Sequence, residues 1–287
     1  MSKTDFIPDW FYSDDIRPYI FLRRENRSVL PGSTHPLEWF SDKSILEIDP
    51  LRVENLNFAE AIYQLEGGAF EASDMAMPRW VFYDCAIIPG LCCGFAMRRS
   101  AIPESLLKVI KPSEDLEWVP ISLFIAIPTA MEGQWVAHNL SSGNSFLAKE
   151  DRMKGLGFLT KAFGLWYSNI KKLCGVTQWG SPSIKLHSFY GNIEILTAYT
   201  PVHTHAGTLT YKSWVDCRMW SRFFTREKSP AFDFYYKNAG FQIDPKSDDS
   251  MKGFQIRIES GQGPFFLYND EIRHKGLDES LDVFKLK

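Results

Sequence analysis

The sequence predicts an α+β fold built on a mainly antiparallel curved sheet or β-barrel with a few peripheral helices. Between residues 80 and 215, short apolar and β-branched runs follow one another, and turn residues separate them. Only two stretches with helical spacing interrupt these runs, at 103–110 and around 159–170. Strands that follow one another with short turns are typical of consecutive antiparallel pairing, so we expect one curved sheet over 80–215.

Composition favours a single globular domain over residues 1–287. Hydrophobic residues make up 45% of the chain, which is enough for a large core. We expect an N-terminal wrap and helix over 1–79, the barrel core over 80–215 and a helical and hairpin extension over 216–287. The net charge of −3 is spread without long runs of one sign, so neither a nucleic acid nor a membrane surface is expected as a partner. Homo-oligomerisation is left open.

The N-terminal residues and the cysteines indicate a soluble cytoplasmic protein. The sequence begins MSKTDFIPDW, with acidic residues where a secretory signal needs a basic segment, and no apolar run reaches the length of a membrane span. There is no CxxC pair, so neither a zinc ribbon nor a disulfide framework is indicated. We predict reduced, buried thiols at Cys85, Cys92, Cys93, Cys174 and Cys217.

The first third of the chain predicts one helix. Residues 1–50 lack a sustained period and are expected to wrap the surface. Asp49-Pro50 then supplies an N-cap and a first-turn proline for a helix over 51–68, which Gly67-Gly68 should end. Glu66 on this helix is assigned to its solvated surface, as most helical glutamates are, over the alternative of a site carboxylate.

The middle of the chain alternates strands with one short helix. Residues 80–90 and 91–98 are predicted as two strands that meet at the turn between them, followed by a helix at 103–110. Strands are predicted over 118–128 and from Gly133, the second ending where the apolar character stops, at His138 and Asn139. These two polar residues are therefore candidates for hydrogen bonding to a substrate.

Downstream, the runs GVTQW, SIKLHSF, GNIEILTAYTP and GTLTYKSWVD predict a meander of strands. Strand alternation would place Lys185, His187 and Phe189 on one face, so His187 would point into a hollow barrel, with Gln178 nearby. At the C-terminus, FQIRIES and GPFFLYND predict a hairpin, and residues 276–287 a short surface helix.

Lys161 is the candidate catalytic residue. It lies in a predicted helix where Phe158 and Leu165 flank it with apolar side chains. Desolvation favours the neutral amine, which is the form that attacks a carbonyl carbon. The alternative is a lysine whose stem crosses a partly buried helix and whose ammonium reaches solvent.

His203 and His205 lie two residues apart in an extended segment and could share a face. A catalytic zinc ordinarily takes three protein ligands, and this pair supplies two. We therefore predict no metal site.

A family resemblance follows from the order of these elements. A strand pair, the helix 103–110, a strand ending at Pro128, a Gly133-x-Trp135 segment and then Gly157–Lys161 together resemble the acetoacetate decarboxylase family over residues 80 to 211. The resemblance implies a cone-shaped β-barrel and a lysine that forms a Schiff base with a keto group.

Two departures from that family's pattern alter what the resemblance implies. Thr160 occupies the position of the family's Schiff-base lysine, and Ser122 the position of its active-site glutamate. The resemblance therefore implies related carbonyl chemistry, with Lys161 as a displaced amine, rather than the family's own reaction.

The predicted function is an acetoacetate decarboxylase-like lyase that acts on a small keto acid without a cofactor. Lys161 would condense with the carbonyl group, and His138, Asn139, Gln178 and His187 would bind the substrate. The alternative is a non-catalytic protein that binds a small molecule in the same cavity, with Lys161 as its counter-ion.

Overall fold

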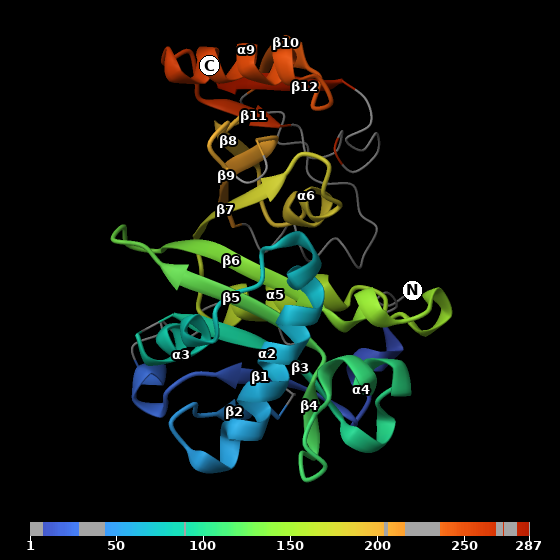
Figure 1. The fold of residues 1–287 in the computed structure, drawn as a ribbon. Coiled ribbons are helices and arrows are strands. Elements are labelled where there is room, and N and C mark those ends of the chain that lie inside the picture. The colour runs from blue at the N-terminus through green and yellow to red at the C-terminus, as the bar shows by residue number, and fades with distance from the viewer. Residues whose placement is uncertain are drawn as a thin grey trace, which may run out of the picture. The chain divides into compact units, whose positions relative to one another are not determined.

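The computed structural model describes residues 8–28, 44–88, 90–203, 206–215, 236–267, 272 and 280–286. The chain divides into two compact units, residues 7–170 (the N-terminal unit) and residues 171–287 (the C-terminal unit), and each is described by itself (Figure 1). Whether both belong to one domain stays a prediction. None of the helices in the described ranges combines the length and the apolarity needed to span a bilayer.

The N-terminal unit is built on a mixed sheet. Its strands are β1 (Ile16–Phe21), β2 (Leu46–Ile48), β3 (Leu91–Arg98), β4 (Trp118–Pro120), β5 (Ser122–Pro128) and β6 (Gln134–Ser142). They pair in the order β2-β1-β3-β5-β6, with β4 added to β3, and every described pair is antiparallel except β1 with β2. The predicted surface wrap over residues 1–50 is therefore wrong for β1, which lies between two other strands.

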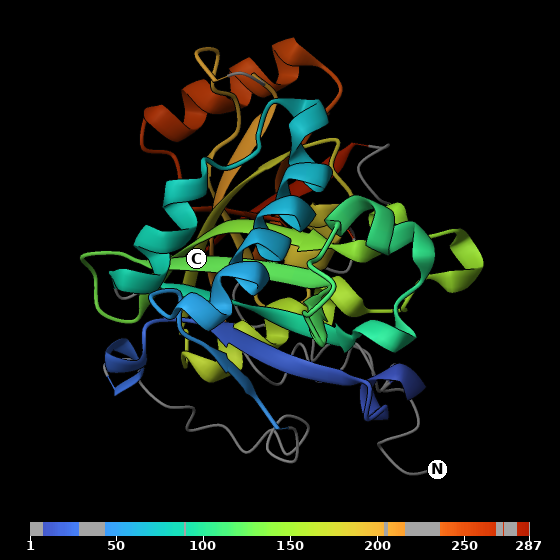
Figure 2. The ribbon, with the colours of Figure 1, turned by 60° about the horizontal axis from the view of Figure 1, so that its bottom comes forward.

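Helices cover both faces of this sheet. They are α2 (Leu56–Phe70), α3 (Arg79–Ile87), α4 (Glu104–Ile110) and α5 (Leu156–Tyr167), with short 3-10 turns at Asp9–Tyr12, Arg24–Ser28, Val53–Asn55, Glu71–Ser73, Arg99–Ala101, Gly143–Phe146 and Lys149–Asp151. On α5, Thr160 donates to Ser122 Oγ at 2.7 Å, whereas Glu66 of α2 is bonded to Asn139. Asn139 pairs with Ile125, whose side chain alternates away from Ser122. Helices α2 and α5 thus lie on opposite faces (Figure 2).

Burial on two faces explains the sequences of the central strands. Every residue of β3 from Leu91 to Met97 is buried, as is β5 from Ser122 to Ala126, which is the continuous apolar pattern of strands covered on both sides. The packing leaves no room at Gly94, where a Cβ would lie 2.0 Å from the carbonyl oxygen of Ser122.

One strand prediction and one helix prediction in this unit need correction. Residues 80–87, predicted as strand, belong to α3, because Phe82, Cys85 and Ala86 bury one helical face. The helix predicted over 51–68 is α2, which begins at Leu56 and continues through Gly67-Gly68 to Phe70. The helix at 103–110 and the strands over 118–128 and 134–142 are present.

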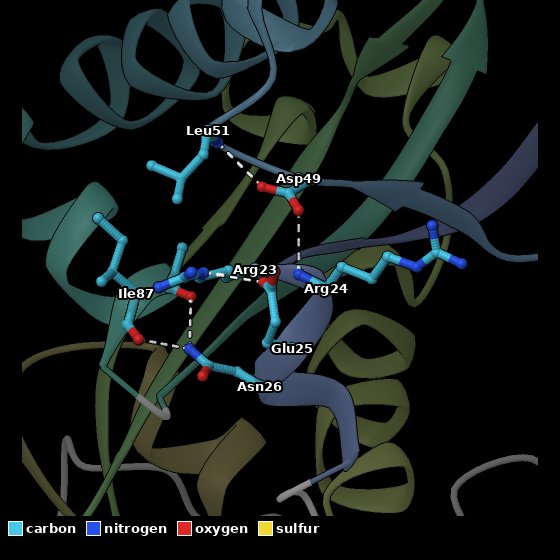
Figure 3. Close-up of polar contacts among 8 residues, drawn as sticks. Arg23, Arg24, Glu25, Asn26, Asp49, Leu51 and Ile87 are labelled. Atoms are coloured by element: carbon cyan, nitrogen blue, oxygen red, sulfur yellow. Dashed lines mark hydrogen bonds and ion pairs between the residues drawn. The ribbon is translucent and has the colours of Figure 1, made fainter.

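Asp49 is not the N-cap of α2, as predicted, because that helix has Asn55 at its N-cap position. Its carboxylate accepts the N–H groups of Leu51 and Arg24, each at 3.0 Å (Figure 3). Burial would raise its pKa, but these two hydrogen bonds lower it overall. Nearby, Asn26 donates to the carbonyl oxygens of Ala86 and Ile87, so the 3-10 turn that follows β1 is hydrogen bonded to the end of α3.

The strands of the C-terminal unit pair antiparallel and pack beside a core within that unit. Its elements are β7 (Lys172–Gln178), α6 (Ser183–His187), β8 (Ile193–Thr197), β9 (Thr208–Trp214), β10 (Tyr236–Ile243), α9 (Asp248–Glu259), β11 (Phe265–Leu267) and β12 (Leu281–Leu286). The strands pair in the order β10-β12-β11-β8-β9-β7. The core includes Trp179, Ile195, Tyr211, Phe254 and Val283.

Three predictions in this unit are wrong. SIKLHSF, predicted as a strand, contains α6, and FQIRIES lies within α9, where Ser247 caps the helix and Met251 and Phe254 bury one face. The predicted C-terminal helix contains β12. The predicted barrel is also wrong, because the pairing order in each unit never returns to its first strand and helices cover both faces of the N-terminal sheet.

Candidate functional site

Strand β6 carries a β-bulge at His138. Ile125 of β5 pairs with Asn139 while the next residue, Ala126, pairs with Ala137, so His138 has no opposite residue on β5. A bulge interrupts the ladder, leaves one residue unpaired and redirects its side chain, and bulges are frequent beside functional sites. The side chain of His138 is exposed. Its position on this strand makes it available to a bound molecule.

A side-chain clamp closes the loop that follows β6. Asn144 donates from Nδ2 to the carbonyl oxygen of Met153 at 2.7 Å, and the N–H of Met153 donates to Asn144 Oδ1 at 2.8 Å. Within the loop, Arg152 Nε donates to the carbonyl oxygen of Leu147 at 3.2 Å. The clamp therefore fixes the backbone just before helix α5.

The N-terminus of α5 has the features of an anion site. Gly155 is the N-cap with a φ of +78°, a conformation that favours glycine, and Gly157 lies in the first turn. The first N–H groups of a helix have no carbonyl partner within that helix, and the helix dipole makes this end positive. The side chains of Arg152 and Lys154 just before the helix are exposed. Phosphate groups bind in such settings.

Lys161 lies one turn beyond Gly157 on the same helix. Its side chain is 1% exposed, and desolvation by burial lowers its pKa from 10.5 to about 7. Helical side chains lean toward the N-terminus, so its stem runs back toward the turn that holds Gly157. Helix α5 packs on the sheet face opposite Asn139, so the structure does not bring these two predicted site residues together. The chemical role of Lys161 stays a prediction.

Glu66 is fully buried, which corrects its assignment to the solvated surface of the helix. Both of its carboxylate oxygens lie 3.1 Å from the N–H of Met77, and Asn139 Nδ2 donates to Oε1 at 2.5 Å. Burial raises its pKa, and these hydrogen bonds only partly oppose that effect. The neighbouring His138 has its Nδ1 3.3 Å from Asn139 Oδ1. The structure thus joins the predicted residues His138 and Asn139 to a buried carboxylate.

Gln178 and His187 belong to the C-terminal unit, and their predicted substrate-binding roles stay predictions. Gln178 ends β7. His187 lies on α6 rather than on a strand, is 8% exposed, and its ring centroid is 5.1 Å from that of Tyr211. The strand face predicted for His187 therefore does not exist.

The predicted absence of a metal at the His203 and His205 pair stays a prediction. His203 lies in the turn before the gap at residues 204–205, so His205 is outside the described residues.

The anion-site residues were missed by sequence reasoning although the signal was present. Arg152-Met153-Lys154-Gly155-Leu156-Gly157 places two glycines and two basic residues between a strand and a helix, which is the setting of phosphate-binding loops. The segment was interpreted for its lysine instead. No comparable signal marked Glu66, because its burial depends on Asn139, 73 residues away.

Comparison with protein-family models and with curated proteins found no match. Several solved structures are similar. The NatC complex bound to Gag peptide and CoA is 12% identical, with 58% of this chain and 96% of that chain covered and a TM-score of 0.40. The ribosomal-protein-S18-alanine N-acetyltransferase from Escherichia coli is 11% identical, with 58% and 91% covered and a TM-score of 0.35.

A third similar structure is the ribosomal-protein-alanine N-acetyltransferase from Brucella melitensis, 13% identical, with 55% of this chain and 94% of that chain covered and a TM-score of 0.37. The second and third of these structures are named as N-acetyltransferases rather than decarboxylases, and the sheet of this chain is open. The predicted acetoacetate decarboxylase-like family, its lyase activity on a keto acid and the barrel-cavity alternative are therefore wrong.

Proposed function

We propose that the chain is an acyltransferase that binds an acyl-CoA and transfers the acyl group to an amine. The observation that carries the proposal is the clamped, glycine-containing N-terminus of α5. Arg152 and Lys154 supply positive charge there, and Gly155 and Gly157 leave the backbone open to a pyrophosphate. Because Asn144 already fixes Met153, little ordering is needed when the ligand binds.

The separation between this anion site and the bulge favours an extended ligand over a simple phosphate. His138 lies four residues before the end of β6, which is about 13 Å along a strand. CoA carries its thioester on an extended pantetheine arm, whose amide groups can hydrogen bond to strand backbone. The thioester would then reach the bulge while the pyrophosphate occupies the helix end.

The predicted site residues take roles within this proposal. His138 and Asn139 would lie where the acyl group meets the acceptor amine. The charge of Lys161 would interact electrostatically with the anion bound at the N-terminal end of the same helix, and Lys161 would not form a Schiff base.

Calorimetric titration of the full chain with CoA and acetyl-CoA tests the proposal. Gly157→Asp should abolish binding, because a carboxylate in the first turn repels the pyrophosphate. The same carboxylate interacts favourably with the helix dipole, so thermal stability should not fall. Gly253→Asp is the matched control, since it adds the same charge to α9 where a new Cβ meets nothing within 4 Å. That variant should bind like the wild type.

Two results would contradict the proposal. One is the absence of CoA binding to the wild type at millimolar ligand. The other is equal loss of binding in both aspartate variants, which would place the ligand elsewhere and make net charge the cause.

A further inference from the structure

A chain of three polar side chains runs from the interior of the N-terminal unit to the bulge on β6. It starts at Glu66, which is 0% exposed, passes through Asn139 and ends at His138, which is exposed. The two links are 2.5 Å from Asn139 Nδ2 to Glu66 Oε1 and 3.3 Å between Asn139 Oδ1 and His138 Nδ1.

The chemistry of the three groups fixes the direction of each hydrogen bond. Both carboxylate oxygens of Glu66 accept from the N–H of Met77, and Oε1 also accepts from Nδ2 of Asn139, so the amide of Asn139 presents its NH2 group to Glu66. Its Oδ1 then faces His138 and can only accept. Nδ1 of His138 must therefore carry the hydrogen, which leaves the lone pair of the neutral ring on Nε2.

We infer that His138, held in this tautomer by Asn139 and Glu66, is the general base for the acceptor amine. The inference rests on the proposed acyltransferase function. His138 is the catalytic residue, and Asn139 and Glu66 are positioning residues that act through it. In many enzymes a third group orients the base; here Glu66 would orient His138 through the amide of Asn139.

In the transfer step, His138 carries one proton from the amine to the sulfur of CoA. The amine nitrogen attacks the thioester carbonyl carbon, a C–N bond forms, and the amine proton passes to His138 Nε2. The C–S bond breaks, CoA leaves as a thiolate, and the proton on Nε2 passes to that sulfur. His138 returns to its neutral form, and the products are an amide and CoA.

Nitrogen-15 NMR of the histidine-labelled chain tests the tautomer without any substrate. Neutral histidine in water favours hydrogen on Nε2, so the expected Nδ1–H form of His138 is a specific signature. Asn139→Ala should return His138 to the Nε2–H form. Asn57→Ala is the matched control, because Asn57 also binds a carboxylate, that of Asp115 at 3.0 Å, but at an exposed site. It should leave the signature unchanged.

Activity provides the second readout, measured as CoA thiol released from acetyl-CoA with a panel of primary amines. His138→Ala should lower kcat about 10²- to 10⁴-fold, and Asn139→Ala at least about tenfold. The Kd for acetyl-CoA should not change in either variant. Added imidazole should restore part of the activity of His138→Ala, an effect that a purely structural residue would not give.

Different results would overturn the proposed acyltransferase function and the role of His138. If the wild type does not bind acetyl-CoA, the proposed function fails and the inference falls with it. If the wild type is active but His138 is in the Nε2–H form, the inference alone is overturned. Full activity in His138→Ala, or no rescue of that variant by imidazole, would also overturn it.

Discussion

Among single residues, Lys161 makes the clearest prediction about stability. Its pKa of about 7 in the folded chain lies below the ordinary 10.5, so between these values the unfolded chain binds more protons. The free energy of unfolding of the wild type should therefore rise with pH from about 7 to 10.5. Below pH 7 the buried amine is charged, and the full free energy of burying that charge opposes folding. Lys161→Met removes that cost and should stabilise the chain at pH 7 by about 1–4 kcal/mol.

Urea unfolding at a series of pH values measures this effect. The advantage of Lys161→Met should shrink steadily above pH 7. Lys108→Met is the control, because Lys108 is exposed on α4 and forms an ion pair with Glu104 one turn away. It should change stability by less than about 0.5 kcal/mol, without that pH trend. A constant advantage for Lys161→Met at all pH values would show that packing, not charge, is the cause.

The sequence indicates the chemical character of some residues, but it does not show which residues they contact. The apolar neighbours Phe158 and Leu165 correctly suggested a desolvated lysine at position 161, which is 1% exposed. His138 and Asn139 were marked by their place at the end of an apolar run. Their link to Glu66 could not be read from the sequence, because it depends on packing between a helix and a strand 73 residues apart.

At the scale of elements, the contact between α5 and the sheet depends on Gly164. A Cβ at this position would lie 2.6 Å from Phe124 Cδ1 and 2.9 Å from Cys93 Sγ. Gly164→Ala should therefore destabilise the chain by about 1–3 kcal/mol through overpacking, although alanine favours helix.

Thermal unfolding of Gly164→Ala beside Gly253→Ala tests this expectation. Gly253 is also a helical glycine, but a new Cβ there meets nothing within 4 Å. Its replacement should stabilise the chain by about 0.5–1 kcal/mol. Equal stabilisation by both substitutions would mean that α5 does not pack closely against β3 and β5.

Elements whose pattern is ambiguous over a short length were the ones predicted wrongly. Residues 80–87 and 254–259 are rich in aromatic or β-branched residues, which favour strands as isolated segments, and in 183–187 Ile184 and Leu186 alternate with polar residues as they would in a strand. In each, helical burial outweighs that preference, as Phe82, Ile184 and Phe254 show by packing into a core. The amphipathic stretch of α5 was predicted correctly, because its apolar residues repeat at helical spacing over several turns.

At the scale of the whole molecule, the two compact units have separate cores and should respond separately to core damage. Phe254 is 2% exposed in the C-terminal core and stacks edge-on against Phe265 at 5.1 Å. Phe254→Ala should cost about 3–5 kcal/mol within that unit. In hydrogen exchange, amides of residues 171–287 should lose more protection than those of residues 7–170. Equal loss throughout would indicate one cooperative unit.

The clamp between Asn144 and Met153 also has a consequence for engineering. Because it joins the two ends of the loop through a side-chain amide, residues 145–151 are bracketed by a fixed closure. Doubling the length of a flexible loop adds only about 0.6 kcal/mol of closure entropy. Leu147 in this segment is buried, but residues 148–151 are exposed, so they are a suitable place to insert foreign peptides, which would be displayed beside the start of α5.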